Sequence, residues 1–174
     1  DMIAPSHGII WRKHIPQIME AYQRWSSGQT KKKVVIVYDT MWKSTEKMAG
    51  VIAETVTSHG IEVSLLSLHD NHRSDIMAAL LEASGLFLGS PTIHRNLFPS
   101  VADLLCYMRG LKPAKKLAAA FGSYGWSGEA PDLITEALKE IGFDVISPGL
   151  KAQFLPDASE EASAKALAED MVQR

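Results

Sequence analysis

Hydroxyl side chains gather in a loop that follows a strand-like apolar run ending at residue 38. Thr40, Ser44 and Thr45 are close neighbours in the sequence, and a helical pattern begins beside Glu46. Together with the unpaired backbone N–H groups of a helix start, these hydroxyls can hold a phosphate group with little positive charge. The alternative is an ordinary helix cap, because hydroxyl residues are common at helix starts. Lys43 is expected to be solvated.

This loop lacks the glycine motifs of two common nucleotide sites. It has no Gly-Lys-Ser or Gly-Lys-Thr ending, and no G-x-G-x-x-G pattern follows the strand. The sequence therefore excludes a P-loop and a dinucleotide-binding fold.

Two further loops have residue types that suit a planar ligand. The Gly-Ser-Pro-Thr turn at 89–92 brings backbone close to a ligand, because glycine has no side chain and proline fixes the chain direction. In the loop 122–128, Tyr124 and Trp126 alternate with glycines, an arrangement that favours stacking on a ring over packing in a core. The alternative for this loop is a hydrophobic lid over an ordinary turn, but binding residues gather on loops of rigid scaffolds.

Apolar patterning predicts the elements that must position these loops. Continuous β-branched and aromatic runs indicate strands that are covered on both faces, and spacings of three and four indicate amphipathic helices. Strands are expected at 34–38, 61–68, 86–89, 117–121 and from 143, and helices at 15–25, 45–59, 74–83 (capped by Ser74), 99–108, 131–141 and 160–172.

Strands that alternate with helices predict a doubly wound α/β fold. Right-handed crossovers imply a five-stranded parallel sheet with helices on both faces, and we expect the strand order 2-1-3-4-5. Ligands of such sheets bind outside the carboxyl ends of the strands. The loops after the first, third and fourth strands, which are the three described above, therefore share the expected binding edge.

A polar run at 26–30 divides the chain into two parts. It ends the first helix, whose apolar side chains form one stripe, and precedes the alternating pattern. We expect residues 1–30 to be separate from a main domain at 31–174.

Composition limits the classes of partner and compartment. The net charge of −2 provides no general field for nucleic acid, and no apolar stretch reaches the ~20 residues that cross a bilayer. A single cysteine, Cys106, and the lack of a signal-like segment favour the reducing cytoplasm. Cys106 itself is expected to be a small buried hydrophobe.

Three motifs closely resemble the flavodoxin-like domain of flavodiiron proteins. They are Tyr-Asp-Thr-Met-Trp-Lys-Ser-Thr-Glu-Lys-Met-Ala at 38–49, Gly-Ser-Pro-Thr at 89–92 and Phe-Gly-Ser-Tyr-Gly-Trp-Ser-Gly at 121–128. The resemblance covers nearly the whole chain. It implies a flavodoxin-like fold that binds FMN, with the phosphate in the first loop and the isoalloxazine ring at the other two. The implied FMN-binding residues are Thr40, Met41, Trp42, Ser44, Thr45, Pro91, Thr92, Ile93, His94, Asn96, Ser123, Tyr124, Gly125, Trp126 and Gly128.

His94 departs from the family pattern, which often has asparagine shortly after Pro-Thr-Ile. The hydrogen bond that the asparagine side chain makes in the family is therefore not expected here. His94 and Arg95 could instead place positive charge near reduced flavin, which favours its anionic form.

The first thirty residues resemble another part of the same family. Ala-Pro-Ser-His-Gly-Ile-Ile-Trp-Arg at 4–12 is similar to the end of the metallo-β-lactamase-like domain, which implies that His7 is a di-iron ligand in an intact parent. The other ligand motif of that site does not occur in this sequence. His69 and His72 have no further histidine or cysteine nearby with which to complete a metal site.

The resemblance implies that this chain is a carboxyl-terminal fragment that transfers electrons through FMN. In the parent, rubredoxin or another small carrier supplies electrons, and a di-iron site reduces dioxygen or nitric oxide; the parent is typically a head-to-tail homodimer. The alternative is a free-standing flavodoxin or FMN-dependent quinone reductase. A signalling receiver domain would share the strand order, but Ser90 replaces the phospho-acceptor aspartate after the third strand. A non-binding α/β domain would leave Tyr124 and Trp126 without a role.

Overall fold

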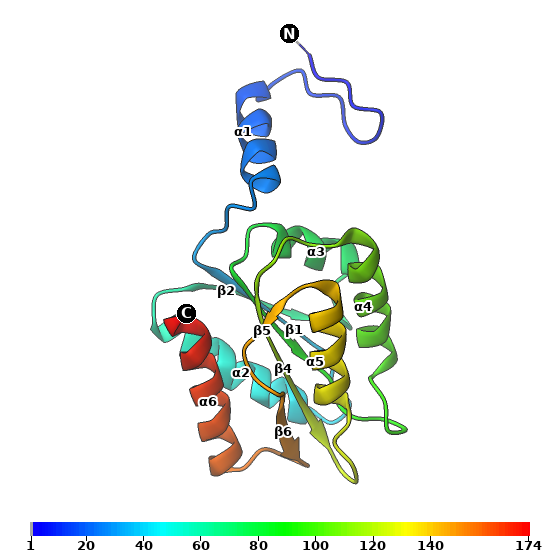
Figure 1. The fold of residues 1–174 in the computed structure, drawn as a ribbon, viewed down its shortest axis with the longest axis vertical. Coiled ribbons are helices and arrows are strands. Elements are labelled where there is room, and N and C mark those ends of the chain that lie inside the picture. The colour runs from blue at the N-terminus through cyan, green and yellow to red at the C-terminus, as the bar shows by residue number, and fades with distance from the viewer. Residues whose placement is uncertain (1) are drawn as a thin grey trace.

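The computed structural model describes residues 2–174 as a three-layer α/β domain with one helix outside it (Figure 1). A parallel sheet forms the middle layer. The strands are β1 (Lys33–Tyr38), β2 (Glu62–Ser67), β3 (Gly85–Gly89), β4 (Leu117–Tyr124), β5 (Asp144–Val145) and β6 (Leu150–Gln153). The helices are α1 (Ile15–Ser26), α2 (Ser44–Ser58), α3 (Arg73–Leu81), α4 (Pro99–Leu111), α5 (Ala130–Ile141) and α6 (Ala158–Gln173).

The strand order confirms the predicted topology. The sheet runs β2-β1-β3-β4-β5 with every pairing parallel, and β6 also pairs with β4. The carboxyl ends of β1, β3 and β4 therefore lie at one edge, because the register pairs Tyr38 with Gly89 and Gly89 with Phe121. The three loops of the sequence analysis begin at this edge.

Each face of the sheet has its own core. Val35 and Val37 of β1 pack in a cluster with α3, α4 and α5, whereas Val34 and Ile36 pack in a cluster with α2 and α6. Successive side chains of a strand point to opposite faces, so an uninterrupted apolar run fills both clusters. Burial of apolar surface in these two clusters is the main stabilising contribution to the fold.

The predicted fifth strand is present, and the structure adds a sixth strand that the sequence did not predict. β5 pairs only with the beginning of β4, and β6 pairs with its end, from Phe121 to Tyr124. Ser147, Pro148 and Gly149 separate the two pieces; proline has no N–H for the ladder, and Gly149 has a φ of 100°. Because β6 gives β4 a partner beyond residue 121, Gly122, Ser123 and Tyr124 belong to the strand, where the sequence predicted a loop.

Two smaller predictions also need correction. The cap of α3 is His72, whose ring Nδ1 accepts a hydrogen bond from the backbone N–H of Ser74 at 3.2 Å. Cys106 is exposed on α4, because it occupies the solvent side of a helix whose other face packs on the sheet. No helix in residues 2–174 combines the length and the apolar character needed to cross a bilayer.

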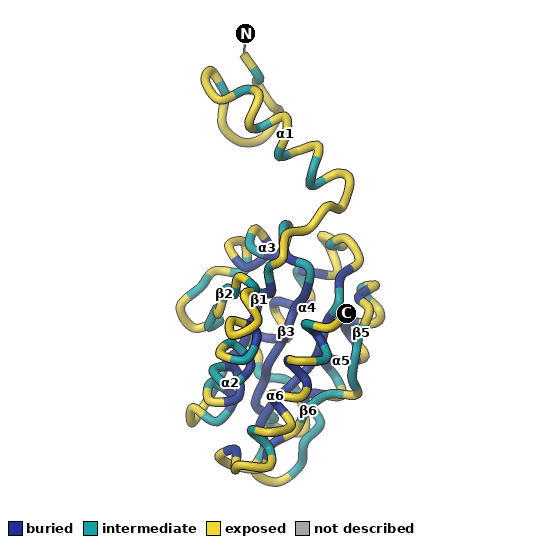
Figure 2. The backbone as a smooth tube through the Cα atoms, turned by 90° about the vertical axis from the view of Figure 1, so that its left-hand side faces the viewer, coloured by how far each residue is buried: buried dark blue, intermediate teal, exposed yellow. Residues whose placement is uncertain are grey.

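Helix α1 projects away from the domain (Figures 1 and 2). It buries none of its residues, and Met19 and Tyr22 are 57% and 59% exposed. The carboxyl end of α1 contacts the domain through Arg24, which forms an ion pair with Glu82 at 3.8 Å. Glu82 also pairs with Lys31, in the segment that follows the helix.

Candidate functional site

A cavity of about 630 Å³ opens at the carboxyl edge of the sheet. All three loops predicted from the sequence contribute to its wall, and the segment between β6 and α6 completes it. The lining residues are Met41, Trp42, Ser44, Pro91, Thr92, Ser123, Tyr124, Gly125, Phe154 and Leu155. None of these side chains carries a charge. A charged group of a ligand must therefore be held by hydroxyl and backbone N–H groups, as the sequence predicted for the first loop.

The first loop is held by a buried carboxylate at the end of β1. Asp39 is 7% exposed, and its Oδ1 accepts a hydrogen bond from the backbone N–H of Thr40 at 2.7 Å. Its Oδ2 accepts a hydrogen bond from the hydroxyl of Ser100 in α4. Lys43 then has a φ of 66°, which turns the chain into α2. These contacts fix the backbone of the loop before any ligand binds.

The hydroxyl of Thr40 is buried and has no hydrogen-bond partner. A buried polar group without a partner is costly, so such a group in a binding loop indicates a ligand that satisfies it. The adjacent start of α2 supplies N–H groups without intrahelical partners. A phosphate oxygen would satisfy both, so the loop fits the phosphate end of FMN.

A hydrogen bond joins the first loop to β4. The hydroxyl of Thr45, which is fully buried, lies 2.8 Å from the hydroxyl of Ser123. Thr45 therefore holds the beginning of α2 against the strand that leads into the third loop.

The second loop contains a tight turn that the sequence analysis missed. The backbones of Ile93 and Asn96 exchange two hydrogen bonds, of 3.0 and 2.8 Å, around His94 and Arg95. These two central residues have φ values of 50° and 58°, as in a type I′ turn, which usually contains asparagine or glycine. The unusual sequence of the turn is the reason that pattern reading did not find it. Both side chains are exposed at its tip.

Close backbone packing joins the second loop to β4. The N–H of Thr92 donates to the carbonyl of Ser123 at 2.8 Å. A Cβ atom on Gly122 would lie 2.0 Å from the carbonyl oxygen of Ser90, so only glycine fits there. The sequence placed Gly122 in a flexible loop, whereas it is a close-approach position inside the sheet.

The structure places the predicted site residues in three groups. Eight line the cavity: Met41, Trp42, Ser44, Pro91, Thr92, Ser123, Tyr124 and Gly125. Thr45 and the hydroxyl of Thr40 are buried, and neither residue is part of the lining. Ile93, His94, Asn96, Trp126 and Gly128 lie outside the lining, and Trp126 is 92% exposed. The lining residues Phe154 and Leu155 were not predicted, because their segment carries no motif and reaches the site only through the pairing of β6 with β4.

The environment of Tyr38 at the end of β1 is apolar and negative. Burial, followed by the acidic groups of Glu46, Asp70 and Asp39, raises the pKa of Tyr38 above its ordinary value of 10.0. The phenol therefore remains neutral at physiological pH next to the first loop.

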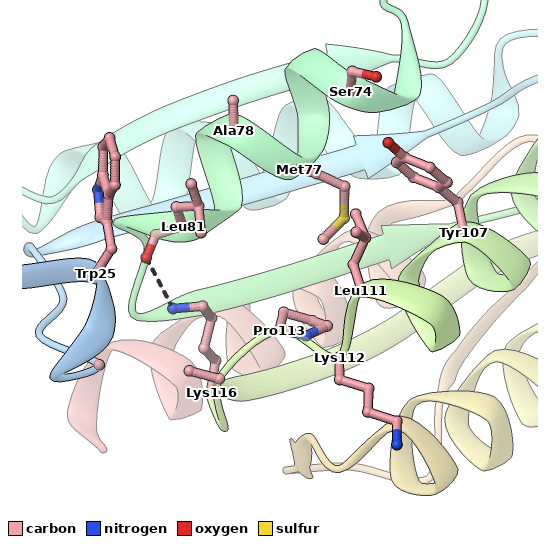
Figure 3. A pocket seen from close by; sticks show the side chains of 12 residues that line it. Trp25, Ser74, Met77, Ala78, Leu81, Tyr107, Leu111, Lys112, Pro113 and Lys116 are labelled. Carbon is pink, nitrogen blue, oxygen red and sulfur yellow. Dashed lines mark hydrogen bonds between the residues drawn. The ribbon is translucent and has the colours of Figure 1, made fainter. Parts of the chain in front are cut away.

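A second cavity, of about 620 Å³, lies at the opposite edge of the sheet between α3 and α4 (Figure 3). The amine of Lys116, which lines this cavity, donates to the carbonyls of Ala83 at 2.8 Å and Leu81 at 3.4 Å. Burial lowers the pKa of Lys116. The amine satisfies carbonyls at the end of α3, which is a structural role. No cluster of three or more His, Cys, Asp or Glu side chains within residues 2–174 is arranged to hold a metal ion.

Comparison with known proteins agrees with the fold. The flavodoxin family model matches residues 36–166, which is most of the chain. The chain therefore belongs to the flavodoxin family, and FMN is the cofactor that the family implies.

The relatives of the chain are flavodiiron proteins. A nitric oxide reductase of Moorella thermoacetica is 46% identical over 155 residues, which are 88% of this chain and 39% of the reductase. The solved rubredoxin oxygen:oxidoreductase of Desulfovibrio gigas superposes over 99% of this chain and 43% of that chain, with a TM-score of 0.92 and 36% identity. The flavodiiron protein of Giardia intestinalis gives a TM-score of 0.90 at 30% identity over the same shares. The chain matches the flavin module of these proteins and spans about two fifths of their length.

Proposed function

We propose that this chain is the electron-transfer module of a flavodiiron oxygen or nitric oxide reductase. The observation that carries the proposal is the uncharged cavity where three loops meet beside the unpartnered hydroxyl of Thr40. When bound, FMN supplies the redox chemistry, and the protein supplies its position and surroundings. No residue of this chain needs to act as an acid or base.

The residues have separate roles in this proposal. Thr40, Ser44 and the first N–H groups of α2 hold the phosphate, and Thr45 positions that loop through Ser123. Pro91 and Thr92 border one side of the ring, and Tyr124 and Gly125 border another. Met41, Trp42, Ile93, His94, Asn96, Trp126 and Gly128 are proposed as the remaining contacts.

A flavin titration tests the proposed cofactor. Flavin-free protein is titrated with FMN, and binding is followed by the quenching of flavin fluorescence. We expect saturable binding of one FMN per chain. Protein that remains colourless and takes up no FMN would contradict the proposal.

Trp126→Ala tests the proposed third loop. Trp126 is almost fully exposed, so its replacement should leave the folded domain intact. We expect weaker flavin binding, because aromatic stacking is lost. Unchanged affinity would remove Trp126 from the site.

We also propose that residues 1–30 are the tail of the metallo-β-lactamase-like domain and a linker helix, and that His7 ligates iron in the intact parent. The lack of buried residues in α1 supports this, because an apolar helix face requires another surface to cover it. Limited proteolysis tests the boundary. We expect cleavage near Gly28 and a resistant core of residues 31–174 that retains flavin.

In the parent, electrons would enter FMN from rubredoxin or another small carrier and leave to the di-iron site. The name of the Desulfovibrio gigas relative supports rubredoxin as a donor. We further propose a head-to-tail homodimer, which the exposed Trp42 and Trp126 beside the site support, and a cytoplasmic location, which the single cysteine supports.

Activity assays distinguish the module from a complete reductase. This chain alone should not reduce oxygen or nitric oxide in an iron-dependent manner, and robust iron-dependent turnover would refute the assignment. A free-standing flavodoxin or FMN-dependent quinone reductase is the other candidate. The gene upstream of Asp1 decides between them, because a flavodiiron parent must encode the remaining iron ligands.

A further inference from the structure

The segment between β6 and α6 presents two large apolar side chains to the cavity. Phe154 and Leu155 line its wall and are 66% and 61% exposed. Figure 1 shows that β6 and the beginning of α6 lie at the same end of the sheet as the carboxyl end of β4. Ligand pockets are lined mainly by apolar and aromatic side chains, so two adjacent residues of this kind in the cavity wall are suited to cover an apolar part of a ligand.

The backbone of Phe154 is strained. Its φ of 59° lies in the left-handed region, which bulky side chains rarely adopt. Such strain persists only where the surroundings hold it, and it gathers at ligand sites. Six non-glycine residues in the described chain have positive φ, and four lie in segments that surround the cavity: Lys43, His94, Arg95 and Phe154.

Hydrogen bonds to the third loop fix Phe154 from one side. Its N–H donates to the carbonyl of Tyr124 at 2.7 Å, and the amide side chain of Gln153 donates to the carbonyl of Gly125 at 3.2 Å. The Phe154 ring lies against Gly125, where an added Cβ would be 3.4 Å from its Cε1 atom. The ring therefore continues the wall that begins with Tyr124.

Helices α2 and α6 fix the segment from the other side. The amine of Lys47 donates to the carbonyl of Pro156 at 2.9 Å. Asp157 caps α6, and Glu160 accepts hydrogen bonds from the N–H groups of Gln153 and Asp157, at 2.9 and 3.0 Å. Because both ends are anchored, Phe154 and Leu155 keep their place without a ligand, and little ordering entropy is lost on binding.

We propose that Phe154 and Leu155 form a fourth wall of the flavin site, which covers part of the bound isoalloxazine and excludes water from it. This inference rests on the proposed flavin site. It adds a segment that contains no flavin-binding motif and that reaches the site only because β6 pairs with β4.

Two substitutions at position 154 separate the effect of the aromatic ring from the effect of the backbone conformation. Phe154→Asn removes the aromatic ring but tolerates the left-handed backbone, whereas Phe154→Tyr retains the ring. Leu111→Asn is the control, because Leu111 is an exposed apolar residue, at 52%, on the far side of the sheet beside the other cavity. Each variant is titrated with FMN and with riboflavin, which lacks the phosphate.

We expect Phe154→Asn to weaken the binding of FMN and riboflavin by the same factor, about tenfold, because only a ring contact is lost. Iodide should quench the fluorescence of bound flavin more strongly in this variant. Leu111→Asn should bind both flavins like the wild type, and Phe154→Tyr, which retains the ring, should bind both more tightly than Phe154→Asn does. Unfolding of the flavin-free Phe154→Asn protein in urea should match or exceed the wild-type stability, since strain is relieved.

Different outcomes overturn different claims. A wild-type chain that binds neither flavin would overturn the flavin site and this inference together. Wild-type binding with a Phe154→Asn affinity within about twofold for both flavins would overturn the fourth wall alone. Weakened binding that accompanies an equal loss of stability in the flavin-free protein would also overturn it, because Phe154 would then be a structural residue.

Discussion

The hydroxyls of Thr45 and Ser123 lie 2.8 Å apart, although 78 residues separate them in the sequence. Thr45 is in the first turn of α2, and Ser123 is in β4 just before the third loop. The contact joins the loop that fits a phosphate to the strand that leads to the aromatic wall. Its strength should therefore affect both the stability of the domain and the geometry of the site.

We expect Thr45 and Ser123 to be energetically coupled. Thr45→Val or Ser123→Ala alone leaves a buried hydroxyl without its partner, which should cost about 1–3 kcal/mol of unfolding free energy. The double variant should cost less than the sum of the two, because no unpaired hydroxyl remains. Urea unfolding of the four proteins gives the coupling energy. Additive losses would mean that the two hydroxyls do not interact.

Thr40→Val should separate ligand binding from stability. The Thr40 hydroxyl has no partner in the protein, so its loss should not reduce the stability of the flavin-free chain. FMN affinity should fall by about 10- to 150-fold, since a hydrogen bond to a charged group is worth ~1.5–3 kcal/mol. Riboflavin affinity should not change. Calorimetric titration with both flavins measures this difference.

The control for Thr40→Val is Thr135→Val. Thr135 has a second buried hydroxyl without a partner, on α5 and outside the cavity lining. Its replacement should keep or raise stability and leave the affinities for both flavins unchanged. Equal effects of the two substitutions on FMN binding would contradict the phosphate role of Thr40.

Gly122→Ala and Gly50→Ala should change stability in opposite directions. A Cβ at Gly122 would collide with the carbonyl oxygen of Ser90 and separate the second loop from β4. We expect a loss of at least about 1–3 kcal/mol, as in other overpacked cores, together with weaker flavin binding. Gly50 lies within α2 in open space, so alanine there should add about 0.5–1 kcal/mol. Thermal unfolding distinguishes these outcomes.

Stability at alkaline pH should depend on Tyr38. Its pKa is raised in the folded state, so the native protein holds this proton more tightly than the unfolded chain does. The contribution is complete below the unfolded pKa of 10.0 and is lost as the pH rises through the folded pKa. Tyr38→Phe should flatten the decline in urea-unfolding free energy as the pH rises above 10.0. The same slope in both proteins would contradict the shift.

The topology of the sheet could be predicted because it depends on local pattern. Val34 to Val37 form a run that can be buried only between two layers of helices, and the alternation of strands and helices leaves few ways to connect a parallel sheet. The positions of the first three functional loops follow from that order. The family resemblance required only the motifs within those loops.

Other features depend on contacts between distant segments. The break at Pro148 and Gly149 could be read as a turn, but only the pairing of β6 with β4 places Phe154 beside Gly125. Likewise, no local pattern reveals that the Thr40 hydroxyl lacks a partner or that Gly122 faces the Ser90 carbonyl.

The sequence by itself determined the order of the strands, the edge at which the loops meet and the residue types that meet there. Only the tertiary structure decided which of those residues line the cavity and which additional segment closes it. The physical reason is separation along the sequence. Patterns of burial and capping arise between residues that are close in the chain, whereas a cavity wall depends on how separate elements pack.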